Sequence, residues 1–161
     1  MVKVGEPASE DMPQSFSSVT VHIVFSTKNR IPSISNEIEG RLYAYIGGIV
    51  RNRKAPLIVV GGTADHLHML VSLPRDVCLA DLVREIKSLS SGWIHEMFGL
   101  KQDFGWQVGY GAFSVSFTSI DSLKNYIAKQ KEHHRGISYK EEFILFLQRH
   151  NLPYVEKYLW E

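Results

Sequence analysis

The chain has 161 residues and a mass of 18.3 kDa, which suits one domain with a sizeable core and is too short for two. Hydrophobic residues make up 44% and charged residues 22%, so the composition excludes a disordered or fibrous protein. The net charge of +1 does not by itself point to nucleic acid. With no bilayer-spanning apolar run, no secretory signal pattern and one cysteine, Cys78, we expect a cytoplasmic protein without internal disulfide bonds.

The first segment of the chain differs in character from the rest. Residues 1–14 are acidic and contain glycine and proline, so we expect a flexible leader outside the fold. Residues 15–161 are expected to form a single domain. Within it, the strand and helix patterns of a compact core run over residues 17–118, and two helical segments follow over residues 119–161.

The first half of the core reads as strand, helix and hairpin. β-Branched residues predict a strand over residues 18–26. A serine and an asparagine, both good N-cap types, open an amphipathic helix expected over residues 36–52. Two apolar strands follow over residues 57–60 and 66–73, and the short glycine-containing connection between them predicts an antiparallel hairpin.

The second half of the core adds a helix and a strand. Apolar residues at helical spacing predict a helix over residues 79–98, and alternation predicts a fourth strand over residues 112–117. The order β-α-β-β-α-β is that of the ferredoxin-like α+β fold, an antiparallel sheet with both helices on one face. One face of the sheet is therefore expected to stay free.

Two histidines stand two residues apart on the strand expected at residues 66–73. His66 and His68 share one face of the sheet, while Leu67, Met69 and Val71 take the other face and are expected to meet the helices. At about 3.3 Å per residue the two imidazoles start roughly 6.6 Å apart, so both can bind one cation above the strand. A half-buried polar pair without a ligand is the simpler interpretation of the same pattern.

Two further helices are expected over residues 123–134 and 139–150. Tyr126 and Gln130 lie four residues apart on the first of them and are therefore neighbours on one face. Taken alone, they are equally well explained as a packed ring and an exposed helix-forming side chain.

Basic side chains gather in two connections and are candidates for phosphate contacts, although solvated loop charges would look the same. They are Lys28 and Arg30 after the first strand, and Arg51, Arg53 and Lys54 after the first helix.

In combination these features resemble the HUH tyrosine transposases of the IS200/IS605 type. The resemblance rests on Asp65-His66-Leu67-His68, on Tyr126-x-x-x-Gln130, on the strand and basic loop of residues 21–30, and on the ending Tyr158-Leu159-Trp160. The motifs are short, but their order, their spacing and the expected fold agree with that family.

The resemblance implies a single-stranded DNA transposase that cleaves and rejoins insertion-sequence ends through a 5′-phosphotyrosine, excising and inserting a mobile element. Tyr126 would be the nucleophile, and a covalent intermediate would conserve the energy of the broken bond. His66, His68 and Gln130 would hold a divalent metal, which the resemblance implies is Mg²⁺ or Mn²⁺. Judged by ligand type alone, imidazoles suit Mn²⁺, Co²⁺, Ni²⁺ or Zn²⁺ better than Mg²⁺.

The resemblance also implies partners. They are a second copy of the chain joined through the last strand, single-stranded DNA with a subterminal hairpin, and, through that DNA, the nucleoid. Whether Tyr126 serves the histidines of its own chain or of the other copy is left open. Three alternatives remain: a non-catalytic, domesticated module that binds hairpins, a hydrolase in which Tyr126 is only structural, and a replication initiator or relaxase, which the small size of the chain makes less attractive.

Overall fold

The computed structural model describes residues 15–100 and 104–160, and the leader expected over residues 1–14 lies outside them. In these two ranges, no helix has the length and apolar character needed to cross a membrane. The strands are β1 (Thr20–Ser26), β2 (Leu57–Gly62), β3 (His66–Ser72) and β4 (Gly111–Val115). The helices are α1 (Asn36–Asn52), α2 (Leu79–Phe98), α3 (Ile120–Ala128), α4 (Gln130–His133) and α5 (Tyr139–Arg149), with short 3₁₀ turns η1 (Lys28–Arg30), η2 (Phe117–Ser119) and η3 (Glu156–Tyr158).

The four strands form one antiparallel sheet in the order β2-β3-β1-β4. With α1 after β1 and α2 after β3, this confirms the ferredoxin-like α+β fold. β3 lies between β2 and β1, so both of its edges are hydrogen-bonded, whereas β4 is an edge strand of this sheet.

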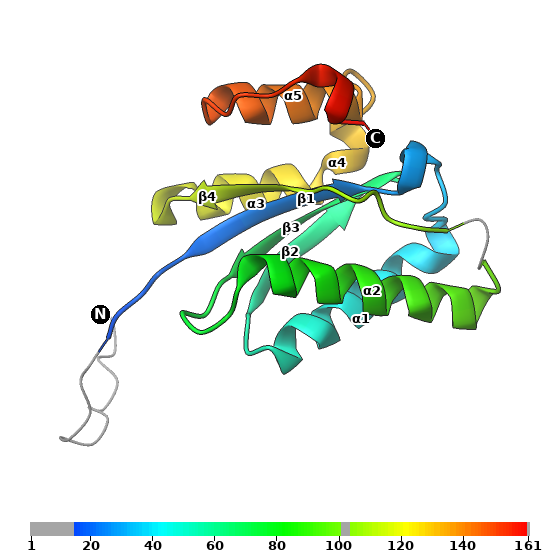
Figure 1. Ribbon diagram of the computed structural model, residues 1–161, viewed down its shortest axis with the longest axis horizontal. Coiled ribbons are helices and arrows are strands. Elements are labelled where there is room, and N and C mark those ends of the chain that lie inside the picture. The colour runs from blue at the N-terminus through cyan, green and yellow to red at the C-terminus, as the bar shows by residue number, and fades with distance from the viewer. Residues whose placement is uncertain (1–14, 101–103, 161) are drawn as a thin grey trace.

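Helices cover both faces of the sheet: α1 and α2 lie on one side and α3, α4 and α5 on the other (Figure 1). The expectation that one face stays free is therefore wrong. The physical reason lies in α5, which has an apolar stripe that must be buried against something. It packs on the side chains that β1 and β4 turn to this face, in a cluster of Val24, Phe113, Tyr139, Phe143, Phe146 and Leu147.

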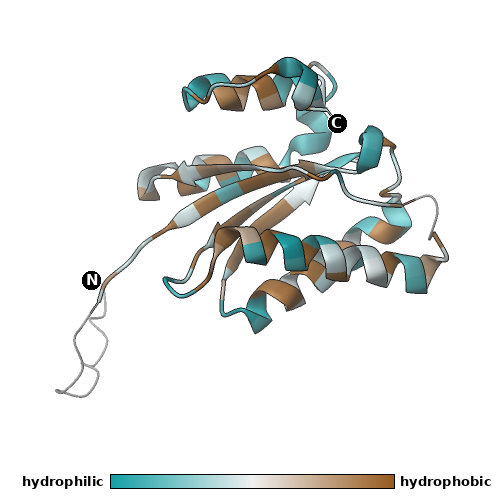
Figure 2. Ribbon diagram, viewed as in Figure 1, coloured by the Kyte–Doolittle hydropathy of each residue, from teal (hydrophilic) through white to brown (hydrophobic). Residues whose placement is uncertain are grey.

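The main core lies between the sheet and the α1–α2 layer. Leu67, Met69 and Val71 of β3 are fully buried there, which confirms the predicted alternation of the strand. α1 contributes Leu42 and Ile46, both fully buried. Figure 2 shows apolar residues along the strands and in bands on α1, α2 and α5, whereas α4 is hydrophilic.

α3 sits unusually close to β2 because Gly61 has no side chain. A Cβ placed on Gly61 would lie 2.5 Å from the carbonyl oxygen of Ile127, which is far too close for any side chain. Gly61 therefore allows α3, the helix that carries Tyr126, to pack directly against the backbone of β2. The hairpin turn itself lies beyond the glycines, after the end of β2.

The helix expected over residues 123–134 is in fact two helices, so that prediction is wrong in detail. α3 ends at Ala128, and Lys129 (φ −103°, ψ 21°) leaves the helical conformation before α4 begins. The Lys129 N–H reaches the carbonyl oxygens of both Asn125 and Tyr126, which tightens and ends the helix. Tyr126 and Gln130 thus lie on different helices that change direction between them.

Candidate active site

The paired histidines of β3 point to the face covered by α3, α4 and α5. His66 is 1% exposed and His68 is fully buried, and their ring centroids are 5.3 Å apart. The two rings share a face as predicted, but the expected exposure to solvent is wrong because the C-terminal helices lie over them. Tyr139 of α5 covers His66, with 4.7 Å between the ring centroids.

His66 is oriented by the hairpin turn that precedes it. Its Nδ1 lies 2.7 Å from Asp65 Oδ1 and 2.9 Å from Thr63 Oγ1. Burial alone would raise the pKa of Asp65, but the hydrogen bonds with His66 and Thr63 lower it, so the carboxylate stays ionised. With Nδ1–H donating to Asp65, the lone pair of His66 Nε2 faces the interior of the site, where Gln130 Oε1 lies 3.3 Å away.

His68 is oriented by a third histidine, His22 of β1. The His68 Nδ1 and His22 Nε2 atoms are 2.9 Å apart, and the two rings stack with their centroids 5.1 Å apart. Burial lowers the pKa of His68 to about 4 and that of His22 to about 3, so both rings are neutral near pH 7. When His68 donates its one proton to His22, its Nε2 lone pair also faces the site.

The phenol of Tyr126 approaches the histidines from α3. Its ring centroid is 6.1 Å from that of His68. The hydroxyl donates to a carboxylate oxygen of Glu142 and lies 3.2 Å from His133 Nε2. Burial raises the pKa of the phenol, and the neighbouring Glu142 charge raises it further, so Tyr126 is protonated in this arrangement.

Glu142 of α5 is a residue of the site that sequence reasoning missed. The side chain is 2% exposed, and its Oε1 lies 2.9 Å from His68 Nε2. Its Oε2 lies 3.1 Å from His133 Nε2 and 3.2 Å from His134 Nε2. Burial alone would raise the pKa of Glu142, but the adjacent His134 and His68 and the Tyr126 hydroxyl hold it well below its usual range.

The sequence contains a pattern that indicates this carboxylate. Glu142 lies three residues after Tyr139 and four before Phe146, so it belongs to the apolar, sheet-facing side of α5. An acidic residue at such a position needs partners, because an unpaired buried charge is strongly unfavourable. His22 gave a weaker indication: it is polar and lies on an apolar strand, opposite the histidine strand.

The donor atoms present fit a divalent metal. One ligand atom from each of His66, His68, His134 and Glu142 can be chosen so that all lie within 4.8 Å of one another. Buried polar atoms without a hydrogen-bond partner among the described residues are His68 Nε2, Gln130 Nε2, His134 Nε2 and Glu142 Oε1. Such atoms are rare in folded proteins unless a water or an ion satisfies them. The predicted ligands His66, His68 and Gln130 thus converge, and their role as ligands stays a prediction.

The basic residues predicted to contact DNA lie at opposite ends of the sheet. Lys28 and Arg30 form η1 just after Ser26, which pairs with His66, so both are at the His66 end. The Arg30 guanidinium lies over the Trp160 ring, 5.5 Å from its centroid.

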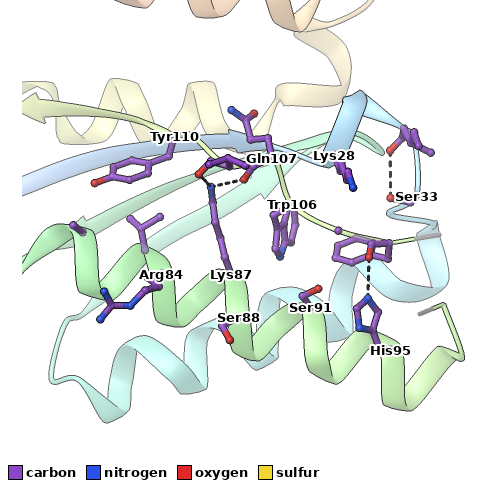
Figure 3. Close-up of a pocket in the computed structure, with 16 residues that line it drawn as sticks. Lys28, Ser33, Arg84, Lys87, Ser88, Ser91, His95, Trp106, Gln107 and Tyr110 are labelled. Carbon is purple, nitrogen blue, oxygen red and sulfur yellow. Dashed lines mark hydrogen bonds between the residues drawn. The ribbon is translucent and has the colours of Figure 1, made fainter. Parts of the chain in front are cut away.

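Lys28 also borders a cavity of about 640 Å³ on the α2 side of the sheet (Figure 3). Lys87 of α2 reaches across this cavity and donates to the backbone carbonyl oxygens of residues 107, 108 and 109. The Lys87 ammonium is thereby occupied in holding the segment that leads into β4.

The second basic group follows the end of α1. Arg51, Arg53 and Lys54 precede Leu57, which pairs with Val71 at the far end of β3. Five residues of strand separate that position from His66, a span of roughly 17 Å. Arg53 forms an ion pair with Glu85 of α2, so part of this charge is neutralised within the fold. The structure does not bring the two basic groups together.

The solved structures that share this fold include the following two. One is a candidate transposase from Deinococcus radiodurans R1, at 20% identity and a TM-score of 0.61, covering 76% of this chain and 98% of that one. The other is a REP-associated tyrosine transposase bound to a REP hairpin, at 19% identity and a TM-score of 0.58, covering 79% of this chain and 74% of that one. No curated protein sequence matches the chain.

The fold therefore defines a ferredoxin-like α+β protein of the kind seen in these two structures. The family model of IS200-like transposases matches residues 15–130, which is more than half of the chain. The chain belongs to the IS200-like transposase family, and the resemblance drawn from its motifs is confirmed.

Proposed function

We propose that this transposase cleaves and rejoins single-stranded DNA at the ends of an insertion sequence, through a 5′-phosphotyrosine on Tyr126. The observation that carries the proposal is the meeting of Tyr126 with the histidine pair, with 6.1 Å between the Tyr126 and His68 ring centroids within one chain. β3 supplies the histidines, and the adjacent helices α3 and α4, some sixty residues later in the chain, supply Tyr126 and Gln130. Their convergence is hard to explain by packing alone, because buried polar side chains are unfavourable without partners.

The reaction uses groups that the chain provides. The Tyr126 oxygen attacks the scissile phosphorus, the bond to the 3′ oxygen breaks, and the 5′ phosphate is held on the tyrosine. The phenol gives up its proton along its hydrogen bond to Glu142, and the leaving 3′ oxygen takes up a proton. A second 3′-hydroxyl then displaces the tyrosine oxygen and restores a phosphodiester, so no external energy source is needed.

His66, His68 and Gln130 would hold a divalent metal, Mg²⁺ or Mn²⁺, beside the phosphate. When bound, such an ion supplies stabilisation of the negative charge that develops on the phosphoryl oxygens. The chain's own contribution is orientation. Asp65 fixes the ring of His66 and His22 fixes that of His68, so both Nε2 atoms face the same space before DNA arrives.

An open pocket gives single-stranded DNA a route to Tyr126. It has a volume of about 680 Å³ and lies between β4, α3 and α5. The exposed ring of His150 offers a surface for an unpaired base, and Arg149 offers a charge for the backbone. The REP-associated structure holds a hairpin, and we propose hairpin-bearing single-stranded DNA as the partner here too.

We propose that the active form is a homodimer joined through β4. Within the described part of the chain, β4 pairs only with β1, which leaves its other edge open. An open edge strand invites pairing with another chain. Residues 15–161 would then act as one domain in each copy, with residues 119–161 supplying the tyrosine.

The test is the formation of a covalent protein–DNA adduct. Labelled single-stranded DNA that carries the element's end is incubated with Mn²⁺ and the full chain, and the adduct is resolved on a denaturing gel. Tyr126→Phe should bind the DNA and form no adduct, whereas Tyr45→Phe, which removes a hydroxyl from a ring stacked on Trp93, should react normally.

The outcomes separate the alternatives. An adduct formed by Tyr126→Phe at the normal rate would remove Tyr126 from the mechanism. Cleavage by the unaltered chain without an adduct would identify a hydrolase. Hairpin binding with neither product would identify a non-catalytic module.

A further inference from the structure

Two atoms at the centre of the site face each other in a way that hydrogen bonding does not explain. His68 Nε2 and Glu142 Oε1 are 2.9 Å apart, and both are buried. Neither has a hydrogen-bond partner among the described residues, so their approach lacks the direction that a hydrogen bond needs. The ring proton of His68 has an acceptor elsewhere, at His22 Nε2. When that proton goes to His22, the Nε2 lone pair of His68 points at the Glu142 carboxylate.

Two lone-pair atoms at this distance repel each other unless a cation lies beside both. Adjacent ligands of an octahedral ion with bonds of about 2.1 Å lie about 3.0 Å apart, close to the observed separation. A second nitrogen and oxygen, His66 Nε2 and Gln130 Oε1, lie 3.3 Å apart in the same site, at hydrogen-bond distance. The two pairs together present two nitrogen and two oxygen atoms to one space.

We infer that Glu142 is a further ligand of the divalent metal, bound through Oε1. The inference deepens the proposed function, on which it rests. The family match ends at residue 130, so α5 and its carboxylate lie outside the matched segment. Glu142 is nevertheless held in place, because α5 begins with a capping box between Ser138 and Glu141 and is packed through Phe146.

A carboxylate ligand resolves a difficulty with the histidine pair. Imidazoles alone are poor ligands for Mg²⁺, which prefers oxygen. Glu142 adds a charged oxygen beside the amide oxygen of Gln130, and the site then carries a formal negative charge that suits Mn²⁺ or Mg²⁺. A site of this composition should bind Mn²⁺ firmly even without DNA.

The second oxygen of the same carboxylate accepts the Tyr126 hydroxyl. Glu142 therefore links the nucleophile to the metal through three atoms. A change at Glu142 alters the ligand set, whereas a change at its neighbour Glu141, which is exposed on the outer side of α5, does not.

The test measures metal binding by the full chain without DNA, so cleavage activity does not enter. Mn²⁺ is titrated calorimetrically into the unaltered protein, Glu142→Gln and the matched control Glu141→Gln. Visible spectra of bound Co²⁺ report the ligand set, and circular dichroism checks the fold. Glu142→Gln should bind Mn²⁺ at least about tenfold more weakly, since losing even an outer-shell partner of a ligand costs that much, and should shift the Co²⁺ bands because a direct ligand is lost. Glu141→Gln should leave both unchanged.

Mn²⁺ affinity and Co²⁺ bands that are unaltered in Glu142→Gln would overturn the inference, as would an unaltered protein that binds no Mn²⁺. If Glu142→Gln fails to fold, Glu142→Leu, which fills similar space without a ligand atom, replaces it, and the same two readings decide. The inference and the proposed function fail separately. Mn²⁺ binding that depends on Glu142, without any DNA adduct, would contradict only the proposed function. Adduct formation together with Mn²⁺ binding that does not depend on Glu142 would contradict only the inference.

Discussion

The two faces of β3 are built from alternate residues of one strand, and they have opposite characters. Leu67, Met69 and Val71 enter the core against α1 and α2, where burial of apolar surface contributes about 1.5 to 3 kcal/mol for each large side chain. His66 and His68 are buried just as completely on the other face. There, a satisfied hydrogen bond contributes only about 1 kcal/mol, and an unsatisfied atom opposes folding.

The difference shows that one face maintains the fold and the other maintains a reactive arrangement. The helices that cover the second face, α3, α4 and α5, place polar side chains beside the histidines rather than an apolar surface. Changes on the first face should therefore act on stability, and changes on the second on metal binding and cleavage. Four experiments test this division, in order of decreasing effect.

The largest effect is expected for His66→Ala or His68→Ala. Each removes a proposed metal ligand, so Mn²⁺-dependent adduct formation should fall by about 10² to 10⁴-fold, as when an electrostatic stabiliser of the transition state is lost. Chelation with EDTA should do the same to the unaltered chain. His95→Ala on α2, whose ring donates a hydrogen bond to the Phe104 carbonyl on the other side of the sheet, is the control. Normal cleavage by either site variant would contradict the division.

Met69→Ala should show the opposite behaviour. The side chain is fully buried in the main core, so its truncation should lower the free energy of unfolding by about 2 to 5 kcal/mol. Urea denaturation measures the loss. At a temperature where the variant is folded, its Mn²⁺ affinity should match that of the unaltered chain, and a large fall in that affinity would show that the two faces are coupled.

Acid should weaken the metal-free protein through the histidine face. The folded-state pKa of His68 is about 4, below its ordinary value of 6.5, and that of His22 is lower still. Below pH 6.5 the unfolded chain binds protons that these two folded-state rings do not, so their contribution to stability falls from pH 6.5 down to about pH 4 for His68 and about pH 3 for His22. The loss should be on the order of 3 kcal/mol for His68.

Urea titrations in EDTA across this pH range measure the effect. His22→Phe should flatten the pH dependence, because a ring that cannot be protonated replaces a titrating one. If the free energy of unfolding depends on pH equally steeply in His22→Phe and the unaltered chain, the titrating group lies elsewhere.

The smallest effect is expected at the surface. Lys28→Ala with Arg30→Ala, at the His66 end of the sheet, should weaken single-stranded DNA binding several-fold and reduce its salt dependence, by about 0.7 in the log–log slope for each lost phosphate contact. Arg51→Ala with Lys54→Ala, at the far end, is the comparison. Equal changes in both pairs would show that DNA spans the whole sheet.

Patterns within a few residues were enough to predict most of the fold and part of the site. The alternation at His66 to Val71 fixed which side chains share a face, and the cap at Ser35 marked the start of α1. The single helix expected over residues 123–134 was wrong because no glycine or proline marks the break at Lys129, and nearby residues do not reveal the close packing of α3 on Gly61. That contact joins residues far apart in sequence.

The same limit applies to the site. Tyr126, Gln130 and the histidines belong to recognisable motifs, so they could be proposed before the structure was known. Glu142 and His22 belong to none, and their importance follows only from what lies opposite them. An open sheet face was expected because no local pattern states where α5 packs.

The central position of β3 in the sheet determines how fast its backbone amides exchange with solvent, compared with those of α4. Its amides are hydrogen-bonded to neighbours on both edges, so those from His66 to Ser72 should be among the last to exchange with deuterated solvent. α4 has only four residues and a hydrophilic surface, and its amides should exchange early. β3, which carries the histidines, would thus stay in place for hours while α4, which carries Gln130, opens and closes repeatedly. Each opening would give DNA an opportunity to enter.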